Sequence, residues 1–306
     1  MRIAVLGAGA MGSWYGGFLA RAGHEVQLLT RNDEHIRAVT ENGLEMRGAY
    51  GEFTVDLAIS RPEEFRGGVE LLLTLTKTFQ LEQAMHCVQQ SLDPATTVLS
   101  LQNGLGNAEV IERYVGRDNT FIGVSLLPID KIAPGVLEAT GKGGTWFGQI
   151  DGGQVDRAKA IQAAFSSTPL DVQHDPDILQ RVWEKVAFNA GMNAVCALCH
   201  ATPGLIGDSK AATLLLRDVA DEVARVALAE NVCIDNESVY RTIRFACEHH
   251  RNHKPSMLQY LLSGKTTEVS ALNGAVVARG KNAGIDTPVN SMLDAMVQLA
   301  ERGHSI

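Results

Sequence analysis

The sequence predicts an α/β fold, in which an N-terminal doubly wound parallel sheet is followed by an all-α C-terminal domain. Three observations carry this prediction. Short apolar runs alternate with helix-like stretches in the first half of the chain, as parallel strands and their crossover helices do. A glycine-rich turn follows the first apolar run directly. The second half consists almost entirely of stretches with the pattern of helices.

The elements of the first half follow from this pattern in order. The chain begins with a βαβ unit, because the run 2–6 predicts a buried strand, 13–22 a helix and 25–29 a second strand. Gly43 ends the next predicted helix, since glycine is favoured just after a helix. Further strands are expected at 44–59 (as a strand-turn-strand), 69–76, 96–101, 120–126, 135–140 and 144–148, and helices at 33–42, 81–92 and 107–114.

In the second half, Thr287 and Pro288 have the pattern of an N-cap followed by proline at the first helical position. The segment 167–176 contains two prolines and predicts a domain boundary. The expected domains are therefore 1–170, which binds a dinucleotide, and 171–306, a helical domain that holds substrate and catalytic groups. Helices are expected at 177–199, 209–231, 237–250, 267–282 and 288–301.

The turn after the first strand carries glycine in the spacing GxGxxG. Gly7 permits the tight turn, Gly9 lets the backbone approach a pyrophosphate, and Gly12 lets the helix pack closely on the strand. The free N–H groups at the helix N-terminus then bind the anion. The motif predicts a dinucleotide site made by Gly7, Gly9, Ala10, Met11 and Gly12.

Arg31 indicates which dinucleotide is bound. An NAD site has Asp or Glu at the end of the second strand, where the carboxylate accepts a hydrogen bond from the ribose 2′-OH. Here Thr30 and Arg31 stand at that place. A guanidinium suits a 2′-phosphate, so NADPH is favoured over NADH. The alternative is a solvated Arg31, with Asp33 or Glu34 contacting the ribose.

Composition excludes several classes of function. The 306 residues carry a net charge of −8, which argues against a nucleic-acid partner. No apolar run reaches transmembrane length and the N-terminus reads as a strand, so we expect a cytoplasmic protein without a membrane partner. Five scattered cysteines predict reduced thiols. Cys196–His200 matches the pattern of c-type haem attachment, but it lies in an apolar helical stretch, where packing thiols are favoured. The cluster Cys247, His249, His250 and His253 does not space a closed ligand set, and no metal site is predicted.

Polar residues follow two of the predicted buried strands. Lys77 ends one strand and Asn103 the next. Ligands of a doubly wound sheet bind outside the carboxyl ends of the strands, so both side chains are expected at the cofactor. The alternative for Asn103 is that, with Gly104, it forms only a turn.

A second group of polar residues lies on the first helix of the second half. Lys185, Asn189 and Asn193 recur every four residues and form one stripe about 12 Å long on an otherwise apolar helix. Buried polar groups need partners, so the stripe predicts a ligand-facing surface. The alternatives are an exposed face of the helix and inter-helix hydrogen bonds by the asparagines. Glu268 either faces Lys185 or caps the helix that it opens.

These residues together resemble the ketopantoate reductase (2-dehydropantoate 2-reductase) family over nearly the whole chain. The resemblance implies a Rossmann-type domain followed by a helical domain, and NADPH-dependent reduction of ketopantoate to D-pantoate on the route to pantothenate and coenzyme A. It implies that Lys185 donates the proton and that Glu268 supports it. The matching segments are the glycine motif, Arg31, Lys77, Gln102–Gly104, Lys185–Asn193, Ser256–Gln259, Thr267–Glu268 and Asn273–Gly274.

The same resemblance implies that Asn103, Asn189, Asn193 and Ser256 bind a small 2-oxo acid, with Asn103 also at the nicotinamide. Tyr260, Ser270 and Leu126-Leu127-Pro128 depart from the family pattern. The alternatives that follow are a related NADPH-dependent reductase of another 2-oxo acid and, more remotely, an NADPH-binding sensor without catalysis. Whether two copies of the chain form a homodimer stays open.

Overall fold

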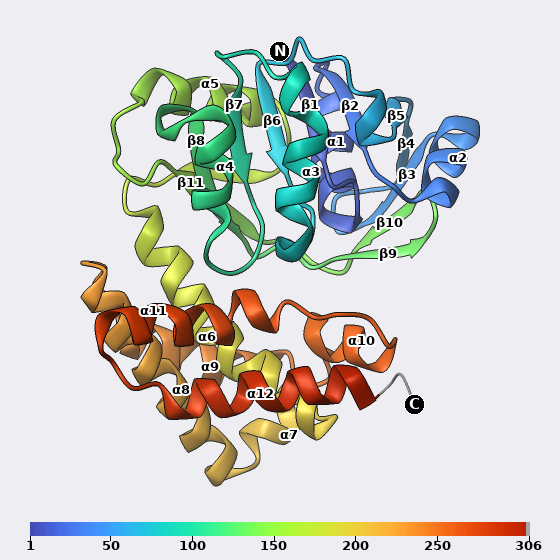
Figure 1. Cartoon of the computed structure of the whole chain (residues 1–306). Coiled ribbons are helices and arrows are strands. Elements are labelled where there is room, and N and C mark those ends of the chain that lie inside the picture. The colour runs from blue at the N-terminus through green and yellow to red at the C-terminus, as the bar shows by residue number, and fades with distance from the viewer. Residues whose placement is uncertain (304–306) are drawn as a thin grey trace. The chain divides into compact units, whose positions relative to one another are not determined.

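The computed structural model describes residues 1–303, and the chain divides into two compact units (Figure 1). The first comprises residues 1–102 and 107–178, and the second comprises 103–106 and the chain from 179 onward. The boundary expected at 170/171 lies before a further strand, β12 (Asp171–His174), which pairs in parallel with β11 (Gly144–Gly148). This strand extends the first unit to Ile178.

The first unit is built on an eight-stranded sheet with the order β12-β11-β8-β7-β6-β1-β2-β5. All neighbouring strands pair in parallel except β11 and β8, which are antiparallel. The doubly wound parallel sheet is confirmed, and β11 is its one antiparallel strand pairing within the described residues, against β8. The remaining strands are β1 (Arg2–Leu6), β2 (Glu25–Leu29), β5 (Ala58–Ser60), β6 (Leu71–Thr74), β7 (Thr97–Ser100) and β8 (Thr120–Ser125).

Alternating residues of β1 enter two separate cores. Ile3 and Val5 pack with α1 (Ala10–Arg21) and α5 (Val155–Ser166), whereas Ala4 and Leu6 pack with α3 (Leu81–Val88) and α4 (Asn107–Val115). Successive side chains of a strand point to opposite faces, so helices cover both faces of this sheet. The helix α5 was not expected from the sequence. Short 3₁₀ turns complete the unit at η1 (Pro62–Glu64), η2 (Thr78–Gln80), η3 (Gln89–Ser91) and η4 (Arg117–Asn119).

A second, four-stranded sheet has the order β4-β3-β10-β9. β3, β4 and β10 were expected from the sequence, whereas β9 and the separation of this sheet from the main one were not. His35 in α2 (Asp33–Asn42) connects this sheet to α1, because its Nδ1 accepts a hydrogen bond from the N–H of Gly135 (2.9 Å) and its Nε2 lies 2.9 Å from the hydroxyl of Ser13. The strands are β3 (Leu44–Gly48), β4 (Phe53–Val55), β9 (Ile129–Ala133) and β10 (Val136–Ala139).

His35 is fully buried, and desolvation lowers its pKa to about 4. The unfolded chain binds a proton near pH 6.5, so between pH 6.5 and 4 the unfolded state binds more protons than the folded state. We expect the stability of the folded protein to fall by about 3 kcal/mol as the pH drops through this window. Urea unfolding of the wild type and of His35→Gln measures it, and an unchanged slope in the variant would contradict the assignment.

The second unit is helical throughout its described part. Its core gathers around α6 (Ile178–Cys199), where small residues such as Ala190 and Ala194 allow close helix packing. None of the helices described for residues 1–303 combines the length and apolar composition that a bilayer span requires. The other helices are α7 (Pro203–Gly207), α8 (Lys210–Ala229), α9 (Asn236–His249), α10 (Ser256–Leu262), α11 (Asn273–Ala283) and α12 (Pro288–Gly303).

The helix expected over 267–282 is interrupted. A 3₁₀ turn, η5 (Val269–Ala271), precedes α11, and Leu272 between them has the non-helical angles φ −104° and ψ −95°. Asn273 then holds α11 in place, because its Nδ2 donates to Ala190 O (3.0 Å) and to Asn290 Oδ1 (3.1 Å). Asn273 is fully buried and serves helix packing.

Candidate active site

The three glycines of the turn between β1 and α1 have two different roles: two are required by packing, and one leaves room for a ligand. A Cβ on Gly7 would lie 2.3 Å from the backbone nitrogen of Thr76, and a Cβ on Gly12 would lie 2.3 Å from the carbonyl oxygen of Gly7. Backbone contacts therefore require these two glycines. A Cβ on Gly9 would meet nothing within 4 Å. Open space over the backbone at Gly9 is what close approach of a phosphate needs.

The start of α1 suits an anion. Gly9 is its N-cap and supplies no side-chain acceptor, and no acidic residue lies in the first turn. The first N–H groups of the helix, which include those of Ala10, Met11 and Gly12, have no intrahelical acceptor and carry the positive end of the helix dipole. The residues present fit the pyrophosphate of a dinucleotide.

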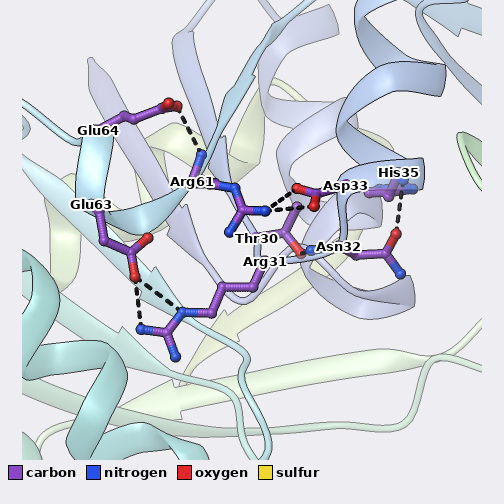
Figure 2. A network of polar contacts seen from close by, with 8 residues as sticks. All are labelled: Thr30, Arg31, Asn32, Asp33, His35, Arg61, Glu63 and Glu64. Atoms are coloured by element: carbon purple, nitrogen blue, oxygen red, sulfur yellow. Dashed lines mark hydrogen bonds and ion pairs between the residues drawn. The ribbon is translucent and has the colours of Figure 1, made fainter.

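Arg31 lies just beyond the end of β2, as expected, but it has a protein partner there (Figure 2). Its Nη2 lies 2.8 Å from Oε1 of Glu63 and 3.1 Å from the sulfur of Cys87. Asp33, which was the alternative contact for the ribose, binds the guanidinium of Arg61 with both carboxylate oxygens. Neither Arg61 nor Glu63 belongs to a motif that the sequence indicated.

The carboxyl ends of β6 and β7 are joined by a side chain. Gln102, after β7, donates from Nε2 to the carbonyl oxygen of Thr76 (2.9 Å) and to its hydroxyl (3.0 Å). Lys77 follows Thr76 directly and is partly exposed at the N-cap of η2. Lys77 thus lies just after the buried strand β6, as expected. The hydrogen bonds from Gln102 to Thr76 hold the backbone next to Lys77 in place.

The chain crosses into the second unit at Asn103. Nδ2 of Asn103 donates to Oε2 of Glu268 (3.3 Å), and the N–H of Leu105 donates to the carbonyl oxygen of Ala271 (2.9 Å). The side chain of Glu268 forms no capping hydrogen bond with η5, which it opens. Its buried carboxylate is thus turned toward Asn103, and the capping alternative does not hold.

Lys185 on α6 lies within the electrostatic reach of the same carboxylate. Burial lowers the pKa of Lys185 from 10.5 to about 8, and the negative charge of Glu268 acts in the opposite direction. An ammonium that titrates near neutral pH can give up a proton readily, whereas an ordinary lysine holds it to higher pH. Lys185, Glu268 and Asn103 therefore form one charged, partly desolvated group.

Asn189 and Asn193 continue the stripe along α6. Each is 8 % exposed, and within residues 1–303 neither side-chain amide has a hydrogen-bond partner. Buried amides without protein partners usually bind water or a ligand, so the inter-helix alternative is not what the structure shows. Ser256 is exposed at the first residue of α10, and its hydroxyl has no hydrogen bond to this group among the described residues.

The departures from the family pattern lie in different environments. Ser270 is exposed in η5, and Tyr260 is partly exposed with the ammonium of Lys265 5.9 Å from its ring centre. Leu127, in the first unit, is buried, and its N–H donates to the hydroxyl of Ser125. Within residues 1–303 no group of His, Cys, Asp and Glu side chains is arranged to hold a metal ion.

Both units match known family models. Residues 3–152 match the model described as ketopantoate reductase PanE/ApbA, and residues 177–301 match ketopantoate reductase PanE/ApbA C terminal. The chain belongs to the ketopantoate reductase family. It is accordingly an oxidoreductase that acts on a CH–OH group, with the Rossmann-type fold that binds NAD(P) in its first unit.

Relatives in this family match the chain over nearly its whole length. A 2-dehydropantoate 2-reductase of Halobacterium salinarum is 33 % identical over 99 % of each chain. One from Lactococcus lactis is 30 % identical over 98 % of each. Among solved structures, D-mandelate dehydrogenase with NADH and anilino(oxo)acetate has a TM-score of 0.95, 29 % identity and full coverage of both chains.

Proposed function

We propose that this protein reduces ketopantoate to D-pantoate with NADPH, on the route to pantothenate and coenzyme A. Membership of the family and the full-length relatives named for this reaction support the substrate. The observation that carries the chemistry is the group of Lys185, Glu268 and Asn103, in which a lysine of pKa about 8 is held beside a carboxylate. The nicotinamide, when bound, supplies the hydride that reduces the C2 carbonyl.

In this proposal Lys185 is the proton donor. As the C2 carbonyl is reduced, negative charge develops on its oxygen, and an Nζ–H of Lys185 moves to that oxygen. The ammonium also stabilises the charge before the proton moves. Below its pKa of about 8 Lys185 is charged, so it is ready to donate at neutral pH.

The other residues hold the reactants. Glu268 acts through Lys185, because its carboxylate favours the charged ammonium, and Asn103 orients that carboxylate. The amides of Asn189 and Asn193 offer N–H donors for the carboxylate and hydroxyl of the substrate. Ser256 supplies a further hydroxyl to the substrate in the same proposal. Gly7 to Gly12 and Lys77 hold the dinucleotide, and Arg31 receives its 2′-phosphate.

Glu268→Gln tests the coupling between the two charges. Removing the carboxylate removes the charge that keeps Lys185 protonated, so the high-pH limb of kcat/KM should move below the wild-type value near pH 8. We expect kcat/KM at pH 8 to fall about tenfold. The pH profile measures it, with the exposed Glu248→Gln as the matched control. A loss of rate without a shifted limb would assign Glu268 to structure alone.

The direct test follows NADPH oxidation by the purified protein on addition of ketopantoate, beside a panel of other 2-oxo acids. The proposal expects kcat/KM for ketopantoate to exceed that for every other acid by at least about tenfold. Turnover confined to another acid would overturn the substrate but keep the reaction. Nucleotide binding without turnover on any acid would overturn the enzyme mechanism.

A second candidate is reduction of an aromatic 2-oxo acid. The similarity to D-mandelate dehydrogenase, at a TM-score of 0.95, favours it. The oxidised partner of mandelate is phenylglyoxylate, which carries a ring where ketopantoate carries a branched hydroxyalkyl group. Phenylglyoxylate therefore belongs in the panel, and a preference for it over ketopantoate would decide for this candidate.

The proposed location is the cytoplasm, and no nucleic-acid partner is proposed. All five cysteines are free thiols, which suits the reducing conditions of the cytoplasm. The net charge of −8 makes nucleic acid an unfavourable partner. Light scattering of the purified protein decides between a monomer and a homodimer.

A further inference from the structure

The region around Arg31 contains a second arginine that no motif indicated. β5 lies beside β2 in the sheet, with Leu29 opposite Ser60, and the N–H of Thr30 donates to the carbonyl oxygen of Ser60 (3.0 Å). Continuing that register places Arg61 opposite Thr30. The two strands therefore bring Arg31 and Arg61 to the same edge of the sheet (Figure 2). In a doubly wound dinucleotide-binding fold the adenosine ribose lies at the end of the second strand.

Arg61 is held firmly at its backbone. Its N–H donates to the carboxylate of Glu64 (3.1 Å), and Pro62 follows at the first position of η1, where its fixed φ restricts the chain. An arginine on a restrained backbone loses less freedom when it binds an anion. Arg61 is thus a suitable phosphate ligand and not merely a mobile surface charge.

Each arginine is already paired with a carboxylate. Glu63 binds Arg31, and Asp33 binds Arg61 with both oxygens. These four residues, which we call the ribose-edge cluster, sum to zero formal charge. A 2′-phosphate, with a charge of about −1.5 to −2, gains little from a neutral cluster unless a carboxylate is displaced.

Displacement is energetically feasible. The four side chains are 43 % to 61 % exposed, and exposed ion pairs contribute little to stability because water screens them. Bidentate contacts between arginine and phosphate are stronger than these. With NADH a carboxylate in the cluster is favourable, because it accepts a hydrogen bond from the free ribose 2′-OH. One cluster thus contains the groups that favour each dinucleotide.

We infer that the ribose-edge cluster sets the choice between NADPH and NADH: Arg61 is a second ligand of the 2′-phosphate, and Glu63 and Asp33 compete with that phosphate for the two arginines. The inference rests on the proposed use of a nicotinamide dinucleotide. It adds Arg61, Asp33 and Glu63 as specificity-determining residues beside Arg31.

Dissociation constants for NADPH and NADH, measured by fluorescence titration of the full-length protein, test this directly. Arg61→Ala should weaken NADPH about tenfold and change NADH less than about twofold. Glu63→Gln should tighten NADPH about three- to tenfold and leave NADH unchanged or weaker. Arg113→Ala is the matched control, because Arg113 is also exposed and paired with a carboxylate, that of Glu82.

The outcomes separate the two proposals. Equal effects on both nucleotides, or none, in Arg61→Ala and Glu63→Gln would overturn the role of the cluster, whatever the enzyme reduces. If the wild type prefers NADH, Glu63→Gln and Asp33→Asn must still improve NADPH binding, and failure to do so overturns the inference. Failure of the proposed function appears elsewhere, as normal nucleotide binding without turnover of any 2-oxo acid.

Discussion

Replacing Lys185 with alanine is expected to lower kcat by about 10²-fold or more. In the proposed mechanism the variant loses both the proton donor and the positive charge beside the developing oxyanion. Lys185 stands partly buried beside Glu268, with a pKa lowered to about 8 by burial. Water cannot easily replace a donor held at a fixed position on a helix, because the loss of positioning adds to the loss of acidity.

The pH dependence makes this prediction specific. In the wild type, kcat/KM for reduction should fall as the pH rises through about 8, because only the protonated Lys185 can donate. The Lys185→Ala variant should lack this limb. Lys159→Ala, at an exposed position on α5, is the control and should behave as the wild type does. Near-normal turnover of Lys185→Ala, with NADPH bound normally, would remove Lys185 from the mechanism.

Gly104→Ala is the second change expected to have a large effect. A Cβ at Gly104 would lie 2.4 Å from the carbonyl oxygen of Ala271, the same oxygen that accepts the N–H of Leu105. The clash is with backbone, so the segment must move. Asn103 then leaves Glu268, and a misplacement of about 1 Å near reacting groups reduces rates on the order of 10²-fold.

A matched control lies two residues away. Gly106 also has positive φ, +92° against +82° at Gly104, but a Cβ there would meet nothing within 4 Å. Alanine at either site strains the backbone by about 1–2 kcal/mol, and only Gly104→Ala adds an overpacking penalty of about 1–3 kcal/mol. Steady-state kinetics and thermal unfolding of both variants measure the difference. Similar losses of rate and stability in both variants would show that backbone strain, and not the contact with Ala271, is the reason for glycine at position 104.

Local patterns predicted the parts of the molecule that depend on neighbours in sequence. The glycine motif, the strand before it and the helix after it occupy the first 21 residues, so spacing alone identifies them. The stripe of Lys185, Asn189 and Asn193 follows from helical periodicity in the same way. Local spacing could not predict the helix interruption before Asn273. That residue is held in place by hydrogen bonds to Ala190 and Asn290, which lie on other helices.

Local patterns also failed to predict which strands pair with each other in the eight-stranded and the four-stranded sheets. A strand pattern gives the alternation of buried side chains, but it does not give the neighbour of the strand. β11 is antiparallel to β8, and β3 and β10 pair in a separate sheet although 87 residues lie between Gly48 and Val136. Such pairings depend on which faces remain to be buried once the rest of the fold has formed.

The sequence by itself determined the family of this protein, and it predicted the dinucleotide turn and the lysine and asparagines on one helix face. Only the tertiary structure decided how those groups are paired. Asn103 meets Glu268 across 165 residues, and Glu63 neutralises Arg31 across 32. The physical reason is that residue type and local spacing define what a side chain can do, whereas its charge balance depends on partners brought by distant strands and turns.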